Sequence, residues 1–266
     1  MDELFGIQAI AAGYATCRPP VQPYVIERIH RYLRPPDRPH RALDVGCGAG
    51  LSTKPLGQIC RQCFGIEPVE AMLRFSSTVA PEAHFIVGSA EELPISSHSI
   101  DLITAAGSLN YADLSLFFRE AIRVLTPGGI LVVYDFSQGR AFRDSASLSE
   151  WFAEFTRRYP PPKSGQRISP ESLSSLHSGF TVQNHEHFEI GLTLSPDFYL
   201  DYVMTETNVA DAVRQGTPES AIRSWCASTL GSVFQGAARE VLFQGYIAYM
   251  IVAGCRSRYF GLAGIG

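Results

Sequence analysis

Glycines at every second position follow a short apolar run that ends in an acid. The segment from Leu43 to Thr53 reads LDVGCGAGLST, and its turn carries Gly46, Gly48 and Gly50. A glycine-rich turn after a strand lets the backbone approach a ligand closely, because glycine has no side chain. Such turns commonly bind nucleotides, so the segment predicts a nucleotide site.

Two classes of nucleotide cofactor compete for this turn. A dinucleotide turn has the pattern G-x-G-x-x-G, whose third glycine lets the next helix approach the strand. Counted from Gly46, that third position is Leu51, and the observed pattern is G-x-G-x-G. The missing glycine disfavours NAD, and the absence of a lysine from Leu43 to Thr53 disfavours a triphosphate.

Glu67 ends the next predicted strand, in the segment CFGIEP. A carboxylate at this place can accept hydrogen bonds from both hydroxyls of a ribose, and it would repel a 2′-phosphate. The alternative is a solvated acid at the end of a strand. The preceding glycine turn favours the ribose role.

Strands and helices alternate in the first half of the chain. Apolar runs predict strands at residues 41–46, 63–67, 84–89, 99–106 and 129–136. Amphipathic patterns predict helices at residues 25–33, 51–60, 68–79 and 113–125, the last with Asp113 as its N-cap. Two later strands are predicted at 180–190 and 245–254. Strands separated by helices predict a mostly parallel sheet with right-handed crossovers.

Four segments in register carry a resemblance to a known family. They read ALDVGCGAGLST, FGIEPVEAML, GSAEELPISSHSIDLITAAGSLNYAD and FFREAIRVLTPGGILVVYDFS. Together they resemble the class I S-adenosylmethionine (SAM) dependent methyltransferases, in particular the small-molecule group that includes ubiquinone/menaquinone-pathway and trans-aconitate methyltransferases. The resemblance runs from Tyr14 to Phe136. It implies an α/β, Rossmann-like seven-stranded sheet, mostly parallel with an antiparallel last strand, helices on both faces and helical lid insertions.

The resemblance also implies the cofactor-binding residues, with S-adenosyl-L-methionine as the cofactor and S-adenosyl-L-homocysteine as the product. Asp44, Gly46, Gly48 and Gly50 would surround the amino acid tail, and Glu67 would bind the ribose. SAM has no phosphates, which agrees with a turn that lacks a lysine.

Three further segments complete the cofactor site that the resemblance implies. Ser89, Ala90 and Glu91 would border the adenine, with Ser89 standing where many relatives carry Asp. Ala106 would pass beneath the sulfonium. Tyr14 and Arg18 match a Tyr/Arg-Pro pattern on an N-terminal helix that closes over SAM in many relatives, and Arg18 could pair with the cofactor carboxylate. An ordinary surface arginine is the alternative.

Catalysis by such a protein needs few side chains. The sulfonium is a good electrophile, so an in-line approach and exclusion of water supply much of the effect. Asn110 and Tyr111, after the fourth strand, are the candidate catalytic residues, where relatives often carry His-Trp. Asn110 cannot act as a base, but it could orient an acceptor. Packing beneath the lid is the alternative.

Two clusters in the second half of the chain are candidate sites. Tyr199 and Tyr202, in FYLDYVMTETNV, could line an apolar substrate pocket or pack in a helical core. His185, His187 and Glu189 fall on one strand face and could ligate a metal. A wet strand face is the favoured interpretation, so no metal is expected.

The C-x-x-C pair Cys60 and Cys63 has no second ligand pair and is interpreted as reduced thiols.

Composition limits the partners that we expect. The chain has 266 residues, 45% hydrophobic content and a net charge of -4, which disfavours nucleic-acid binding. It shows neither a signal peptide nor an apolar run long enough to span a membrane, so a cytoplasmic monomer or homodimer without a membrane partner is expected. We expect one domain over residues 1–266. Its predicted parts are an N-terminal cap (1–40), a SAM-binding core (41–136), and lid or substrate-binding insertions (137–179 and 196–240).

These patterns predict methyl transfer from SAM to a small organic molecule. O- or C-methylation is favoured over N-methylation, because no Asn-Pro-Pro-Tyr follows the fourth strand. A SAM-binding cyclase or isomerase, which would use the sulfonium electrostatically without transfer, is the leading alternative. A regulatory module on an inactive fold and an NAD oxidoreductase are less favoured.

Overall fold

The computed structural model describes residues 8–33, 39–162, 165–176 and 178–259. The chain divides into two units, which we name the core unit and the helical unit. The core unit takes residues 20–135, 165–188 and 245–266, and the helical unit takes residues 1–19, 136–164 and 189–244. The single-domain organisation with its cap, core and lid parts stays a prediction.

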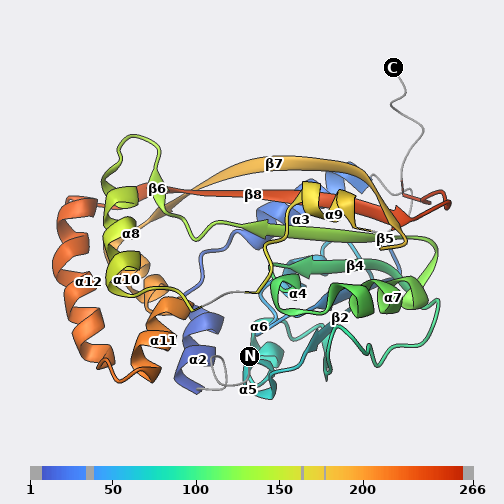
Figure 1. The fold of residues 1–266 in the computed structure, drawn as a ribbon, viewed down its shortest axis with the longest axis horizontal. Helices are drawn as coiled ribbons and strands as arrows, with labels where there is room; N and C mark the ends of the chain where they lie inside the picture. Colours follow the sequence, from blue (N-terminus) through green and yellow to red (C-terminus); the bar gives the residue numbers. More distant parts are fainter. Residues whose placement is uncertain (1–7, 34–38, 163–164, 177, 260–266) are drawn as a thin grey trace. The chain divides into compact units, whose positions relative to one another are not determined.

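An eight-stranded sheet has the strand order β3-β2-β1-β4-β5-β8-β6, and β7 also pairs with β8 (Figure 1). The strands are β1 (Arg41–Val45), β2 (Gln62–Glu67), β3 (His84–Val87), β4 (Ile100–Ala106), β5 (Leu125–Phe136), β6 (Ala141–Phe142), β7 (Phe180–Leu194) and β8 (Arg239–Val252). The strands from β3 to β5 pair in parallel, whereas β6 and β8 pair antiparallel. The Rossmann-like class is confirmed, and the two-residue β6 brings the strand count to eight.

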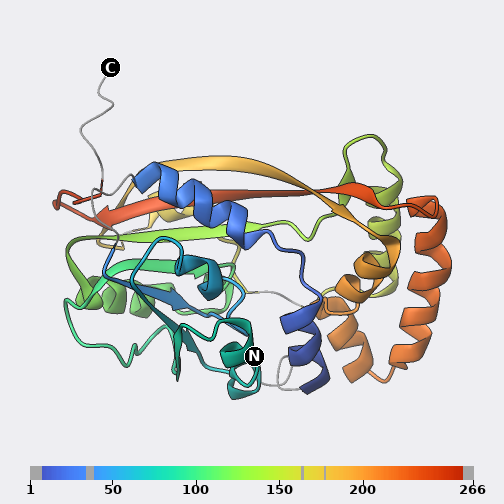
Figure 2. The same cartoon turned by 180° about the vertical axis from the view of Figure 1, so that it is seen from behind.

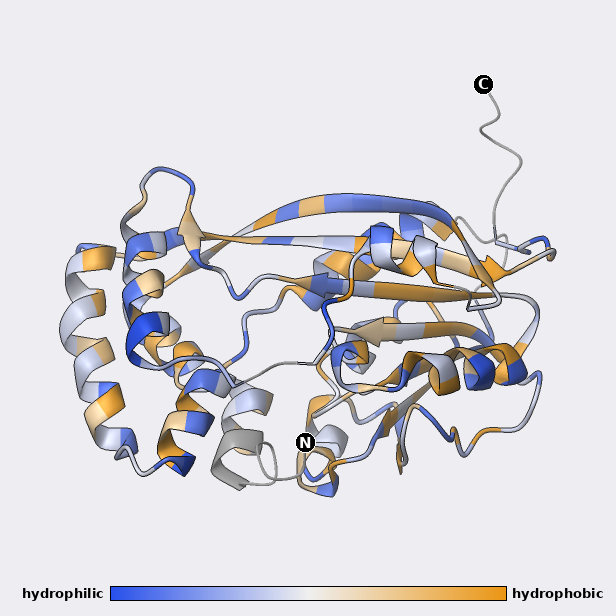
Figure 3. Cartoon of the chain, in the orientation of Figure 1, coloured by the Kyte–Doolittle hydropathy of each residue, from blue (hydrophilic) through white to orange (hydrophobic). Residues whose placement is uncertain are grey.

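The central strands are apolar because both of their faces are covered. All but the last residue of β4 are buried, as are residues 129–134 of β5. Figure 3 shows hydrophobic colours along most of β5 and hydrophilic colours along the middle of β7. The helix α7 (Leu114–Val124) lies in front of the sheet in Figure 1, and α3 (Gln22–Leu33) lies in front in Figure 2. Buried runs of this kind are typical of parallel strands between two helical layers.

The local signals at α7 are confirmed. The side chain of Asp113 accepts hydrogen bonds from the backbone nitrogens of Ser115 and Leu116, as an N-cap does. The end of the helix differs from the prediction. Residues 126–128, between the predicted helix and the predicted strand, lie inside β5 as a bulge, because the register with β4 shifts between Ile100 and Leu102.

Two predicted helices are shorter in the structure than expected. The helix predicted over residues 51–60 is reduced to α4 (Thr53–Leu56), which ends at Gly57. The helix predicted over residues 68–79 is split into α5 (Glu70–Leu73) and α6 (Ser76–Val79). At the split, the Ser76 hydroxyl donates to the carbonyl of Leu73 at 2.7 Å. Such side-chain bonds compete with the helical backbone.

The helical unit is built around aromatic packing. Its helices are α2 (Gln8–Thr16), α8 (Ser147–Arg158), α10 (Pro196–Val203), α11 (Thr207–Arg214) and α12 (Glu219–Phe234). Trp151 of α8 stacks on Phe155 with ring centroids 5.4 Å apart, and on Trp225 of α12 at 5.6 Å. Large stacked rings bury much apolar surface, which explains how α8 and α12 are held together. None of the helices that the structure describes is long and apolar enough to cross a membrane.

Candidate functional site

The glycine turn after β1 depends on glycine at each alternate position. Gly46, Gly48 and Gly50 have φ angles of +70°, +54° and +90°, in the region that side chains disfavour. A Cβ added to Gly46 would collide with Ser108, whose hydroxyl oxygen would lie only 2.9 Å away. A Cβ on Gly50 would lie 3.0 Å from the ring of Phe85. The turn therefore carries no side chain at these positions, and its backbone packs closely against Ser108 and Phe85.

Glu67 fastens this turn to the end of β2. One carboxylate oxygen accepts a hydrogen bond from the backbone nitrogen of Gly48 at 3.0 Å. The other oxygen accepts from the backbone nitrogen of Val69, also at 3.0 Å. The residue is only 7% exposed. The acid is therefore a built part of the site, and the solvated alternative is not what the structure shows.

Asp44 lies beneath the turn and is fully buried. Its carboxylate accepts hydrogen bonds from the hydroxyls of Ser52, Thr53 and Thr104 at 2.6, 2.7 and 3.0 Å. Burial raises the pKa of Asp44, and the three hydroxyls work against that rise. The hydroxyls of Ser52 and Thr53 therefore both donate to Asp44, and the Ser52 side chain does not cap α4. The geometry makes Asp44 a support for the turn.

The predicted adenine turn follows β3 and adjoins Glu67. The backbone nitrogen of Gly88 donates to the Glu67 carbonyl at 3.2 Å, and Ser89 bridges to Glu92. Ser89 and Ala90 are half-buried. The side chain of Glu91 accepts a hydrogen bond from the backbone nitrogen of Asp113 at 2.8 Å, so it braces the start of α7.

The carboxyl ends of β1, β4 and β5 meet beside the turn. Ala106 ends β4, and the Ser108 hydroxyl donates to the carbonyl of Val45 at 2.6 Å. Gly107 has a φ of +63°, and a Cβ there would lie 2.8 Å from a carboxylate oxygen of Asp135. Asp135 was missed by the sequence reasoning. Its signal was an acid near the end of a buried strand, but only the fold shows that β5 lies next to β4.

Asn110 and Tyr111 lie on a short 3-10 helix, η1 (Leu109–Tyr111), which follows Ser108. Gly165 packs so closely on Asn110 that an added Cβ would collide with the Asn110 carbonyl. The side-chain amide of Gln166 donates to the carbonyl of Ala112 at 3.0 Å. Tyr111 is 42% exposed. The core unit thus places both candidates near the strand ends, with residues 165–166 packed over them.

Tyr14 and Arg18 lie in the helical unit, where Arg18 contacts the rings of Tyr14 and Tyr202. The Arg18 guanidinium lies over the rings of Tyr14 and Tyr202, at 4.2 and 5.2 Å from their centroids. It pairs with the buried Glu206 at 3.1 Å and donates to the carbonyl of Thr205 at 3.0 Å. Burial is the largest single effect and lowers the pKa of Arg18, but Glu206, Tyr14 and Tyr202 together outweigh it, so this pKa is raised. The surface alternative is wrong, whereas pairing with a cofactor carboxylate stays a prediction.

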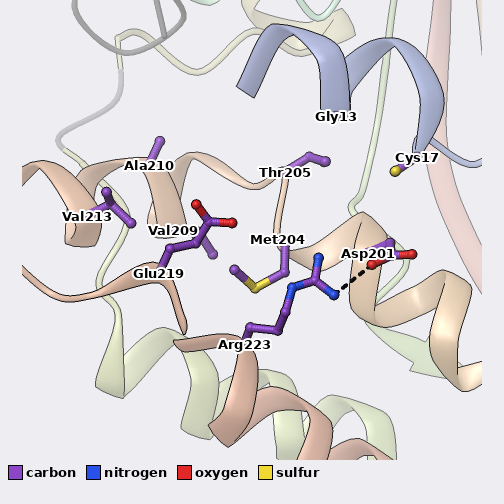
Figure 4. Close-up of a pocket in the computed structure, with 10 residues that line it drawn as sticks. All are labelled: Gly13, Cys17, Asp201, Met204, Thr205, Val209, Ala210, Val213, Glu219 and Arg223. Atoms are coloured by element: carbon purple, nitrogen blue, oxygen red, sulfur yellow. Dashed lines mark hydrogen bonds and ion pairs between the residues drawn. The ribbon is translucent and has the colours of Figure 1, made fainter. Parts of the chain in front are cut away.

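Tyr199 and Tyr202 are both buried in the helical unit. The Tyr199 hydroxyl donates to the carbonyl of Gly139 at 2.8 Å, and burial raises its pKa well above the usual value. Neither tyrosine lines the cavity of about 150 Å³ that the same unit contains (Figure 4). That cavity is lined by Gly13, Cys17, Asp201, Met204, Thr205, Val209, Ala210, Val213, Glu219 and Arg223. The substrate role of the two tyrosines stays a prediction.

The comparisons with known proteins agree with this site. The sequence profile of a family described as "Methyltransferase domain" matches residues 43–133, which include the glycine turn, Glu67 and η1. The ubiquinone biosynthesis O-methyltransferase of Azorhizobium caulinodans is 34% identical over 98 residues, covering 35% of this chain and 39% of that enzyme. Residues 43–133 therefore match a methyltransferase domain, which agrees with the resemblance that the motifs carry.

Two further proteins match a larger share of the chain. An uncharacterised methyltransferase of Bacillus subtilis, YcgJ, is 29% identical and covers 66% of this chain and 69% of its own. A protein from Anaeromyxobacter dehalogenans, proposed as a type II methyltransferase, has the same fold with a TM-score of 0.64 at 22% identity. That structural match covers 88% of this chain and 97% of the other. Several curated relatives are matched over about half of their own length or less.

The residues of this site fit SAM. The turn from Gly46 to Gly50 leaves bare backbone where an amino acid tail could approach, and Glu67 offers a carboxylate for ribose hydroxyls. Gly107 keeps the end of β4 equally bare. When bound, SAM supplies an electrophilic methyl group, and the residues around it need only hold and orient the reactants.

Proposed function

We propose that this protein transfers a methyl group from SAM to a small organic molecule, with oxygen or carbon as the favoured acceptor. The observation that carries the proposal is the hydrogen bond between the Glu67 carboxylate and Gly48, which unites the two most specific cofactor signals in one site. The name of the Azorhizobium relative, an O-methyltransferase, supports oxygen as the acceptor.

The cofactor contacts of the proposal follow the strand ends. The turn of Gly46, Gly48 and Gly50 would hold the amino acid tail, supported from below by Asp44. Glu67 would bind the ribose, and Ser89, Ala90 and Glu91 would border the adenine. Ala106 would lie beneath the sulfonium. Tyr14 and Arg18 are proposed as further cofactor contacts.

The acceptor side of the proposal rests on η1 and the end of β5. Asn110 would orient the acceptor through its side-chain amide, and Tyr111 would contact it. An acceptor hydroxyl with a high pKa also needs a base. Asp135 offers a carboxylate beside Gly107, and its charge contributes to the raised pKa of Tyr246, after the larger effect of burial. We propose Asp135 as that base. Tyr199 and Tyr202 stay proposed substrate contacts.

A paired binding and product experiment tests the proposal. Calorimetry should show SAM binding to the full chain, with the demethylated product S-adenosyl-L-homocysteine as a competitor. SAM with an isotope-labelled methyl group, incubated with a panel of small phenols, should give products heavier by one labelled methyl. A chain that fails to bind millimolar SAM would overturn the proposal. An isomer of the same mass as its precursor would favour the cyclase alternative.

A further inference from the structure

Two histidines lie side by side on the exposed face of β7. His185 and His187 are two residues apart, and side chains at that spacing point to the same face of a strand. Both are exposed, and their ring centroids are 6.0 Å apart at an interplanar angle of 84°. The two imidazoles therefore stand next to each other in the core unit, away from the buried face of the strand.

A third ligand comes from a different element. Glu171 lies in the first turn of α9 (Pro170–Ser175) and is exposed. One ligand atom from each of Glu171, His185 and His187 lies within 4.8 Å of the other two. The sequence indicated Glu189 as the acid beside these histidines. In the structure Glu189 belongs to the helical unit and pairs with Arg143 at 2.9 Å.

The separation of these atoms suits a small divalent ion. Bonds from zinc to imidazole nitrogen or carboxylate oxygen are about 2.0 to 2.2 Å long, so two ligand atoms on a tetrahedral ion lie about 3.3 to 3.6 Å apart. From a spacing of up to 4.8 Å, each group needs a movement of at most about 1 Å to reach that value. All three side chains are exposed and can make that movement by rotation.

The chemistry of the three ligands selects the ion. Imidazole nitrogen suits zinc, nickel and copper, whereas magnesium prefers oxygen ligands. Two histidines and one carboxylate leave at least one position for water on a four-coordinate ion. We propose that Glu171, His185 and His187 form a binding site for a divalent transition-metal ion of the zinc type.

The carboxylate of Glu171 has a hydrogen-bond partner on its own helix. Ser169, the N-cap residue of α9, forms a side-chain hydrogen bond with Glu171. Partners of this kind also orient the ligand toward the ion.

An ion at this site would fasten α9 to β7. The segment that leads into α9 packs on η1, through Gly165 on Asn110 and through Gln166 on Ala112. Ile168 in the same segment is 7% exposed and belongs to the core cluster of the sheet. The ion would therefore steady the segment that covers η1 without touching a reactant. Its binding does not depend on the proposed methyl transfer.

Calorimetry on the metal-stripped full chain tests the site. At pH 7.5, zinc chloride should bind to the proposed site with a stoichiometry of one zinc ion per chain. Magnesium chloride should not compete with zinc. His185→Ala, His187→Ala and Glu171→Gln should each weaken zinc binding by at least about 10-fold. Loss of a residue that only hydrogen-bonds to a metal ligand already costs about 10- to 100-fold in metal affinity. His30→Ala and Glu82→Gln, two exposed residues elsewhere in the core unit, are the matched controls and should bind as the wild type does.

A second measurement separates this site from the six cysteines, because thiolates are also zinc ligands. Zinc should raise the Tm of the wild type and of His30→Ala, but not that of Glu171→Gln. If zinc binds equally well to His185→Ala and His30→Ala, the ion sits elsewhere and the proposal is wrong. Absence of saturable binding to the wild type would overturn it as well.

Discussion

The carboxylate of Glu67 accepts a hydrogen bond from the backbone nitrogen of Gly48 at 3.0 Å, across the carboxyl ends of two neighbouring parallel strands. The second carboxylate oxygen holds Val69 at the start of the next helical segment. One side chain thus fixes the glycine turn after β1 and the chain that leaves β2. The position of the turn and the position of the predicted ribose contact are therefore coupled.

Replacing Glu67 by glutamine should weaken SAM binding. The variant keeps the size of the side chain, but it loses the charge and turns one acceptor oxygen into a donor that faces a backbone N–H. Hydrogen bonds to charged groups contribute about 1.5–3 kcal/mol, which corresponds to a loss of affinity of about 10-fold or more. Calorimetry with SAM measures it. Glu70→Gln, at an exposed acid three residues later, is the control, and equal affinities for the two variants would contradict the role of Glu67.

Gly46→Ala should destabilise the protein and abolish SAM binding. The φ of +70° costs an L-residue about 1–2 kcal/mol, and the new Cβ collides with Ser108. Gly231→Ala in α12 is the opposite case, because its Cβ would meet nothing within 4 Å. That change should stabilise the protein by about 0.5–1 kcal/mol. Urea denaturation compares them, and a shift of the same sign in both would show that the turn tolerates a side chain.

Asp135→Asn should lower kcat for a methyl acceptor with a high pKa and leave SAM affinity close to that of the wild type. Loss of a general base typically costs about 10²- to 10⁴-fold in rate. Asp113→Asn is the matched control, because asparagine also caps a helix well and the acid lies at the start of α7. If the two variants have equal kcat, Asp135 is not the general base.

Local signals allowed the central part of the fold to be predicted from the sequence. Apolar runs located β1, β2 and β4, because buried strands of a parallel sheet leave no polar alternation to confuse the pattern. Asp113 was found as an N-cap since a cap acts on the two or three residues that follow it. The glycine turn was found because its backbone angles demand glycine. Each of these features is decided within a few residues of chain.

Contacts between distant residues could not be predicted in this way. The hydroxyl of Thr104 reaches Asp44 only because β1 pairs with β4, and Asp135 meets Gly107 only because β4 pairs with β5. The partner of Arg18 lies 188 positions along the chain, at Glu206. No periodicity or spacing encodes such pairs. These pairs follow from the strand topology. The position of the glycine turn could therefore be predicted from the sequence, whereas the contacts of Thr104 with Asp44 and of Asp135 with Gly107 could not.

The buried ion pair in the helical unit should contribute strongly to stability. Arg18→Met leaves Glu206 buried without its cation, which should cost about 3–5 kcal/mol of the free energy of unfolding. The double variant Arg18→Met with Glu206→Met removes both charges and should recover much of that loss. Urea denaturation of the single and double variants measures the coupling between the two residues.

An exposed pair provides the control for Arg18. Arg157 and Glu154 pair on the surface of α8, with side chains 76% and 44% exposed. Arg157→Met should cost no more than about 1 kcal/mol, because water screens the charges. If Arg18→Met costs as little as Arg157→Met, then burial of the pair does not decide the stability of this unit.

Tyr199 should make the protein less stable in alkali. Burial raises the pKa of Tyr199 well above 10.0, so the folded chain keeps a proton that the unfolded chain loses. The stabilisation is fully present below pH 10 and is lost as the pH rises through the folded pKa. The free energy of unfolding of the wild type should therefore fall, relative to Tyr199→Phe, by about 1.4 kcal/mol per pH unit above pH 10.

The same variant behaves differently at neutral pH. Tyr199→Phe loses the hydrogen bond to Gly139 and leaves that carbonyl without its donor, so it should be less stable than the wild type by about 1–3 kcal/mol at pH 7.5. Urea denaturation at pH 7.5, 10 and 11 should show the gap closing as the pH rises. Tyr24→Phe, at a residue 48% exposed, is the control. Parallel curves for wild type and Tyr199→Phe above pH 10 would mean that Tyr199 ionises equally in both states, against the burial that the structure shows.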